Sequence, residues 1–281
     1  MIITFILFLF GLIVGSFINA LQYRIQEEKT MRGRSFCPNC KHQLRWYDLF
    51  PIFSWIFLSG KCRYCKKPIS FQYPLIELTT GILFSGVGII SGLSPKINEY
   101  LFSFTDVDAT EITITAVRLV LLLFIVLCSV LVALHDAKTF YVLSRYVYIA
   151  IIASIVFNMF SYNGVWSPDP LGNYFLPFFT SALIATMFFF SLYFFSKGTW
   201  MGAGDAEIAL LIGIFLGWPK TLIAFYFAFI SGSIWGITKV YGFRNAKMKS
   251  EMPFGPFLLS GMFFSYIFGE QLFQLYVKIF I

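Results

Sequence analysis

The chain has 281 residues, of which 58% are hydrophobic, 20% are aromatic and only 12% are charged. Soluble globular domains carry about 25% charged residues, so this composition excludes an ordinary soluble protein and indicates a chain that lies in lipid. The formal net charge is +7, but the basic residues gather in a few loops. That distribution is typical of membrane topology and does not indicate a nucleic-acid partner.

Eight apolar segments are candidates for transmembrane helices, because about 20 apolar residues are needed to cross roughly 30 Å of hydrocarbon. They lie at residues 1–22, 74–93, 113–134, 144–161, 174–195, 203–218, 220–238 and 256–280. We therefore expect an all-α polytopic membrane protein with about eight transmembrane helices. Residues 1–23 form the first of these regions, residues 24–73 a polar insert, and residues 74–281 a helical bundle. The first segment lacks the basic start of a cleavable signal peptide, which we keep only as the alternative.

Basic residues set the expected orientation of the chain. Seventeen of the 21 lysines and arginines fall in the loops 24–72, 135–145, 196–204 and 239–253. Cytoplasmic loops collect such residues, so we expect these four loops in the cytoplasm and both termini outside. The opposite loops carry little basic charge and five acids, namely Glu99, Asp106, Asp108, Glu111 and Asp169.

The polar insert contains two CxxC motifs, Cys37–Cys40 and Cys62–Cys65, with 21 residues between them. Two such motifs are typical of four thiolates around a tetrahedral Zn²⁺. Disulfides or a redox pair are the alternatives, and a cytoplasmic insert argues against them because thiols there stay reduced. Four sulfur ligands leave no position for a reacting water, so we expect a structural ion. His42 is a weaker candidate ligand, and Cys128 is expected to be a small buried residue.

Two aspartates stand at the cytoplasmic ends of apolar segments. Asp205 follows Gly202-Ala203-Gly204 at the start of the sixth segment, and Asp136 ends the third. Charged groups near membrane depth are costly and usually serve a function. If the two segments pack together, one carboxyl keeps a proton while the other activates water, as peptide hydrolysis requires. Taken singly, a solvated juxtamembrane charge and a helix N-terminal acid are the alternatives. His135 is left without a role.

These blocks, in this order, resemble the bacterial type IV prepilin peptidases, a group of GxGD-type membrane aspartic proteases. The resemblance runs nearly end to end. It rests on "GLIVGSFINALQYR", the two CxxC motifs, "FQYPLIELTTG", "HDAKTFYVLS", "MGAGDAEIALLIGIFLGW" and "MPFGPFLLSG".

The resemblance implies removal of a short basic leader after a glycine, on the cytoplasmic side of the bacterial inner membrane, from prepilin or pseudopilin substrates. It further implies methylation of the new N-terminal amine with S-adenosylmethionine. Asp136 and Asp205 would be the catalytic pair and Cys37, Cys40, Cys62 and Cys65 the metal site. Glu77 matches a position linked to methyl transfer, and Asn19 matches the asparagine of the first-span motif. Both would be candidate cofactor-binding residues. The sequence does not indicate which pilin-like protein is the substrate, or the oligomeric state.

Two departures from the family pattern affect these expectations. Glu207 stands where the family usually has a lysine, and Val142-Leu143-Ser144 replaces a common proline after the first aspartate. They leave a methyltransferase-only enzyme, or an inactive assembly partner, as an alternative. A transporter with a zinc-stabilised cytoplasmic plug is a third hypothesis. The "PFGPF" turn at 253–257 is either the start of the last helix or a wall of the active site.

Overall fold

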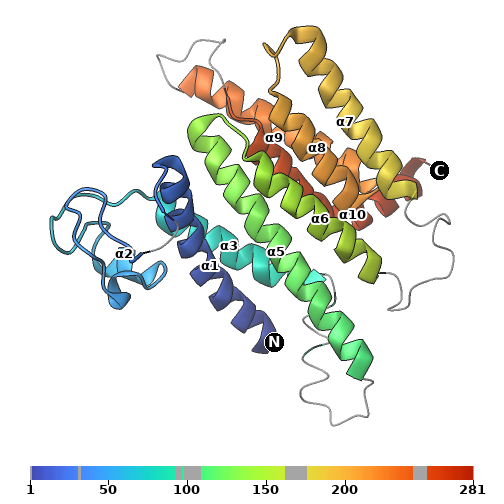
Figure 1. Ribbon diagram of the computed structural model, residues 1–281. Helices are drawn as coiled ribbons and strands as arrows, with labels where there is room; N and C mark the ends of the chain where they lie inside the picture. The colour runs from blue at the N-terminus through green and yellow to red at the C-terminus, as the bar shows by residue number, and fades with distance from the viewer. Residues whose placement is uncertain are drawn as a thin grey trace. The chain divides into compact units, whose positions relative to one another are not determined.

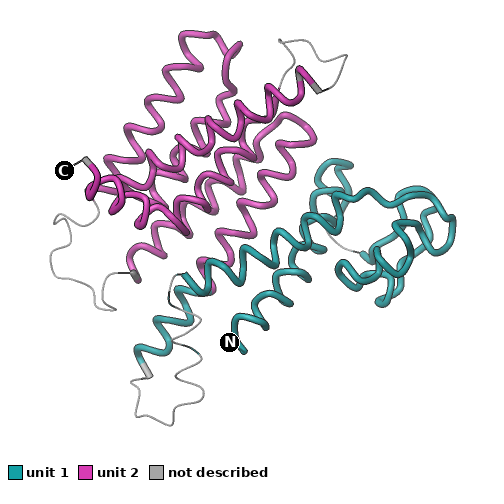
Figure 2. The backbone as a smooth tube through the Cα atoms, turned by 180° about the vertical axis from the view of Figure 1, so that it is seen from behind, with its two compact units in different colours: residues 1–119 teal, residues 120–281 magenta. Residues whose placement is uncertain are grey.

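The computed structural model describes residues 2–30, 33–90, 109–161, 176–242 and 252–280, together with Gly92 and Ile97. Secondary structure in these residues is helical apart from two isolated β-bridges. The chain divides into two compact units, residues 1–119 and 120–281, and the boundary falls within helix α5 (Figures 1 and 2). Of the five acids expected on the outer loops, Glu99, Asp106, Asp108 and Asp169 lie outside the described residues.

The first unit is built on helices α1 (Ile2–Gln26) and α3 (Gln72–Ile90), which pack side by side. Glycines in α1 allow the two backbones to approach closely. A Cβ on Gly11 would lie 2.7 Å from Cα of Gly81, and one on Gly15 would lie 2.6 Å from Cα of Glu77. The "GLIVG" spacing therefore places small residues on one face of α1, as in other close helix pairs within membranes.

The insert between α1 and α3 carries a single turn of 3₁₀ helix, η1 (Trp46–Asp48), and a short helix, α2 (Phe53–Phe57). Residues 48–60 are too few to cross a membrane, and the structure forms only short turns there. These turns lie beside the N-terminal end of α3 (Figure 1).

The second unit contains the C-terminal part of α5 and five further helices. Their bounds are α5 (Ala109–Thr139), α6 (Ser144–Ser161), α7 (Leu176–Ser196), α8 (Ala203–Leu216), α9 (Lys220–Gly242) and α10 (Gly255–Phe280). Helix α8 packs against α6, α7, α9 and α10 and is the most buried element, because ten of its 14 residues are shielded from solvent. Gly213 lies against the Ala182 backbone, and Gly261 against the Ala224 carbonyl, so α7–α8 and α9–α10 pack at short range.

All eight expected spans are helices. Five are long and apolar enough to cross a membrane, namely α1, α3, α5, α7 and α9. Helix α6 is apolar over 17 residues, Ser144–Phe160, and α8 has 14 residues, which at 1.5 Å each rise only about 21 Å. The expected break at Trp218-Pro219 is confirmed, because α8 ends at Leu216 and α9 begins at Lys220.

Candidate active site and metal centre

Asp136 lies in the last two turns of α5 and is 4% exposed. Its Oδ2 accepts a hydrogen bond of 3.0 Å from the backbone N–H of Gly255, the first residue of α10. A buried carboxylate is costly unless it is hydrogen-bonded, and the N-terminus of a 26-residue helix supplies both a donor and a favourable dipole. The "PFGPF" turn thus starts the helix and also contacts Asp136, while its role as a wall of the active site stays a prediction.

Asp205 lies in the first turn of α8 and is 8% exposed. Its Oδ2 accepts a hydrogen bond of 3.2 Å from the Gly202 N–H, which precedes the helix. The role of a helix N-terminal acid, held open from the sequence, therefore holds for Asp205. The contact also fixes the direction of the side chain.

Both carboxyls lie in the second unit, residues 120–281. The Gly255 position links Asp136 to α8, because a Cβ there would lie 2.6 Å from Asp136 Oδ2 and 3.1 Å from Cδ1 of Ile208, one turn after Asp205. Two carboxyls that come close together can divide the roles of base and acid between them.

The loop after Asp136 closes directly onto the glycine motif. A Cβ on Gly204 would lie 2.5 Å from Cβ of Val142, so the absence of a side chain at Gly204 makes room for that valine. This space was expected to admit a substrate strand. In the structure, the loop between α5 and α6 occupies this space. The space beside Gly202 is more open, because the nearest atom to a Cβ added there would be Asp205 Oδ2 at 3.8 Å.

Glu207 points toward a helix that carries neither acid. Its Oε1 accepts a hydrogen bond of 3.3 Å from the Tyr148 hydroxyl on α6. Its Oε2 is buried and has no hydrogen-bond partner among the described residues. Residues two apart on a helix point in widely different directions, so this geometry agrees with the expectation that Glu207 lies outside the pair. His135 is 7% exposed, and within the described part of the chain its Nδ1 also has no partner.

The four cysteines of the insert gather around one point. Their sulfur atoms all lie within 4.8 Å of one another, and Cys37 Sγ is 3.9 Å from Cys65 Sγ. Sulfurs bound tetrahedrally at about 2.3 Å from a Zn²⁺ are about 3.8 Å apart, so the site fits that ion. All five cysteines are free thiols. His42 is not part of the cluster, because its ring packs on Tyr64 at 3.7 Å between centroids.

Each CxxC motif folds as a small knuckle with the same backbone pattern. The Cys37 N–H donates to the His42 carbonyl at 2.9 Å, and the Cys62 N–H donates to the Lys67 carbonyl at 2.9 Å. An isolated β-bridge closes each knuckle, Phe36 with Gln43 and Lys61 with Pro68. The two motifs therefore present their thiols in matching geometry.

The cluster has uneven proton affinity in the absence of a cation. Burial opposes ionisation of Cys37, but N–H groups of Cys40 and Asn39 outweigh it and lower the Cys37 pKa to about 7. For Cys65, the Lys67 N–H lowers the pKa, whereas burial and the hydrogen bonds that the Cys65 S–H donates to neighbouring sulfurs raise it to about 11. A divalent cation at the centre removes the repulsion between thiolates, so metal binding and proton release are linked.

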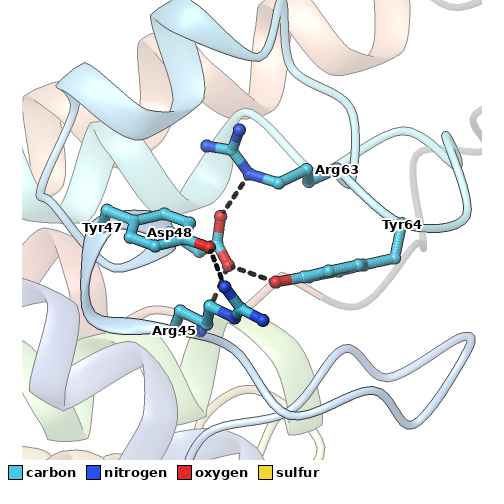
Figure 3. A network of polar contacts seen from close by, with 5 residues as sticks. All are labelled: Arg45, Tyr47, Asp48, Arg63 and Tyr64. Atoms are coloured by element: carbon cyan, nitrogen blue, oxygen red, sulfur yellow. Dashed lines mark hydrogen bonds and ion pairs between the residues drawn. The ribbon is translucent and has the colours of Figure 1, made fainter.

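A polar network ties the second knuckle to η1 (Figure 3). The side chain of Asp48 is 3% exposed and accepts from Arg63 Nε at 2.7 Å, from the Tyr64 hydroxyl at 3.0 Å and from the Arg45 N–H at 3.1 Å. Arg63 and Tyr64 are the two residues between Cys62 and Cys65. Partial burial alone would raise the pKa of Asp48, but these hydrogen bonds lower it. The network therefore supports the metal site with contacts that need no ion.

Asn19 and Glu77 have structural partners. The Asn19 amide donates to the Gly15 carbonyl at 3.2 Å and to the Tyr73 carbonyl at 3.3 Å, which joins α1 to the start of α3. Glu77 is 7% exposed, and its Oε2 accepts from the Ile52 N–H at 2.7 Å, at the start of α2. Their cofactor-binding role stays a prediction. No sequence pattern indicated these packing roles or the contact between Gly255 and Asp136.

Two protein-family models match the chain. The model of the "Bacterial Peptidase A24 N-terminal domain" matches residues 9–90, and that of the "Type IV leader peptidase family" matches residues 121–237. The "Prepilin leader peptidase/N-methyltransferase" of Bacillus subtilis is 30% identical over 274 residues, which are 97% of each chain. The protein of that name from Pseudomonas aeruginosa is 24% identical, over 96% of this chain and 92% of its own. No solved structure matches significantly. These matches cover both the insert and the two aspartates. The protein therefore belongs to the type IV leader peptidase family.

Proposed function

We propose that this protein is a membrane aspartic peptidase that removes the leader of prepilin-like proteins. The observation that carries the proposal is the buried pair of acids, each held by a backbone N–H. The names of its relatives from Bacillus subtilis and Pseudomonas aeruginosa support the substrate class.

In the proposed reaction, a water bound between Asp136 and Asp205 attacks the carbonyl carbon of the peptide bond that follows the leader's glycine. The ionised carboxylate takes a proton from the water, and the protonated carboxyl donates a hydrogen bond to the carbonyl oxygen as it gains charge. The proton taken from the water then passes to the nitrogen of the leaving amine as the C–N bond breaks. The apolar helix of the substrate lies within the bundle during the reaction, while its basic leader stays in the cytoplasm.

The orientation follows from the basic loops. The four loops that hold 17 of the 21 lysines and arginines face the cytoplasm under the positive-inside tendency. This orientation places both acids at the cytoplasmic side and both termini outside, in a bacterial inner membrane.

We further propose that the four-cysteine cluster holds a structural Zn²⁺ and that a methylation step follows cleavage. The spacing of the sulfurs supports the ion. Methylation rests on the names of the relatives, with S-adenosylmethionine as the donor. Glu77 and Asn19 remain candidate residues for that step, while their observed contacts hold the scaffold together.

The test is to co-express Asp136→Asn and Asp205→Asn variants with a prepilin-like substrate and to measure the substrate by mass spectrometry. We expect loss of cleavage in both variants, with protein levels and zinc content unchanged. Near wild-type cleavage by either variant would overturn the assignment of the pair. The same spectra report methylation, because a mature end heavier by one methyl group appears only if the transfer occurs. Methylation of a separately supplied, leaderless pilin, without cleavage of the prepilin, would favour the methyltransferase-only alternative.

A further inference from the structure

An apolar stripe lies on the surface of the insert, on η1, α2 and the loop between them. It consists of side chains that are 38% to 82% exposed, namely Trp46, Leu49, Phe50, Phe53, Ile56 and Phe57. Six of the 12 residues in the segment 46–57 are thus apolar and exposed. Exposed apolar side chains gathered in so short a segment mark a site of contact with another molecule or with lipid.

Contacts inside the first unit fix the direction of this stripe. Ile52 has φ +61° and ψ −52°, and the Phe53 N–H donates to the Pro51 carbonyl at 2.6 Å, which makes a tight γ-turn before α2. This conformation is rare and costly for a β-branched residue. The Glu77 carboxylate accepts the Ile52 N–H at 2.7 Å and holds the turn. On the other side of α2, Trp55 Nε1 donates to the Ile69 carbonyl at 3.2 Å.

The same contacts set the depth of α2 relative to the bilayer. Glu77 is the sixth residue of α3, which is long and apolar enough to span a membrane. It therefore lies about 7.5 Å along the helix from its first residue. The 19 residues of α3 rise about 28 Å, close to the roughly 30 Å thickness of the hydrocarbon. The helix therefore starts near the edge of the hydrocarbon, and a segment bonded to Glu77 lies at the membrane surface and not above it in the cytoplasm.

Helix α2 also packs beside the start of α3. The ring of Trp55 contacts that of Phe71 at 5.7 Å between centroids. Phe71, just before α3, is 63% exposed, and Leu75 and Ile82 on α3 are 48% and 55% exposed. Lipid is what covers exposed apolar side chains on a spanning helix, and α2 is held beside the start of that helix.

Charge around the stripe is complementary to an anionic membrane surface. Residues 37–67 include six basic residues and one acid, Asp48, and that acid is paired with Arg63. Basic residues beside an apolar face are typical of segments that lie in the interface of membranes containing anionic lipids.

We propose that residues 46–57 form an interfacial membrane anchor, in which the apolar stripe enters the cytoplasmic leaflet and the basic residues of the insert bind anionic headgroups. The partner is the lipid bilayer. The anchor holds the metal-binding insert against the membrane surface. The proposal uses the first unit alone and does not depend on the catalytic assignment.

The test uses the full-length protein in lipid nanodiscs, with the photoreactive residue benzoylphenylalanine in place of Phe57, which is 82% exposed. After irradiation, mass spectrometry identifies what is bound at that position. We expect phospholipid adducts, with enrichment of phosphatidylglycerol over phosphatidylcholine in mixed nanodiscs. The matched control carries the same residue at Asn39, exposed on the first knuckle, and we expect at least tenfold less lipid adduct there.

Three results would overturn the proposal. They are peptide adducts to residues 120–281 in place of lipid, adducts to an added prepilin-like substrate in place of lipid, and equal lipid yields at positions 57 and 39. Zinc content confirms that each labelled insert has folded. A second measurement leaves the rest of the stripe unchanged. The fluorescence difference between the wild-type protein and Trp46→Phe should be quenched by brominated phospholipid, and an unquenched difference would contradict insertion.

Discussion

Gly255→Ala tests the geometry of the active site without altering a carboxylate. The new Cβ would lie 2.6 Å from Asp136 Oδ2, whereas carbon and oxygen atoms in contact stay at least about 3.3 Å apart. The Asp136 carboxyl must therefore move by roughly 0.7 Å, since Ile208 Cδ1 at 3.1 Å blocks the other side of the new methyl group. A misplacement of about 1 Å in an active site can cost about 10²-fold in rate.

We therefore expect kcat for cleavage of a prepilin-like substrate to fall by about 10- to 100-fold, or about 1.4–2.7 kcal/mol, with KM little changed. The assay is a time course of leader removal in detergent or nanodiscs. Gly236→Ala is the matched neutral control, because the nearest atom to its Cβ is Met252 Cε at 3.9 Å. Gly261→Ala is the control for structural damage, because the new Cβ would overlap the Ala224 carbonyl. We expect this variant to have a lower Tm, with kcat of the folded protein little changed.

A double-mutant cycle separates positioning from general damage. If Gly255→Ala acts through the Asp136 carboxyl, its effect on Tm should largely disappear in an Asp136→Ala background, where the methyl group has room. Wild-type kcat in Gly255→Ala, with Asp136→Asn inactive, would refute the reasoning. So would a loss of Tm that persists undiminished in the Asp136→Ala background.

Three further predictions concern the first unit. Cys62→Ser should abolish stoichiometric zinc binding, measured by elemental analysis, and a fully loaded variant would contradict the four-thiolate site. Asp48→Ala should destabilise the insert by about 1–2 kcal/mol, seen as faster zinc loss to a chelator, and Asp48→Asn should have a smaller effect. Because the Asp48 pKa is lowered, its contribution is present at neutral pH and is lost as the pH falls through that pKa. Gly15→Val should lower Tm, because a Cβ there meets the Glu77 backbone, whereas Gly86→Ala, in open space, should not.

The helices and the metal cluster were predictable because each depends on local pattern. A run of apolar residues long enough for the bilayer becomes a helix whatever its neighbours are, and Pro219 separates α8 from α9 as the sequence indicated. The two CxxC motifs carry their own turn geometry, so the sulfur cluster follows from spacing alone. The pairing of Asp136 with Asp205 was predicted from topology and stays a prediction, with both acids in the second unit.

The contacts that position these groups were not predictable, because most are made by backbone atoms between distant parts of the chain. Gly255 and Asp136 are 119 positions apart, and every residue except proline has the same backbone donor, so no side-chain pattern marks that partner. For Glu77, a recognisable motif predicts one role and the structure shows another contact. Its motif matched a cofactor role, while the observed carboxylate holds a turn of the insert 25 positions away.

The two departures from the family pattern have limited effect for the same reason. Asp136 and Asp205 are each held by a main-chain N–H, from Gly255 and Gly202, and neither contact requires a lysine at position 207 or a proline after α5. Glu207 bonds to Tyr148 on α6, away from the pair. Val142, in the loop that lacks the proline, packs on Gly204 and so brings that loop against the first turn of α8. We therefore expect the proposed catalytic pair, which is positioned by backbone donors and glycine contacts, to tolerate changes in neighbouring side chains as long as the glycines remain.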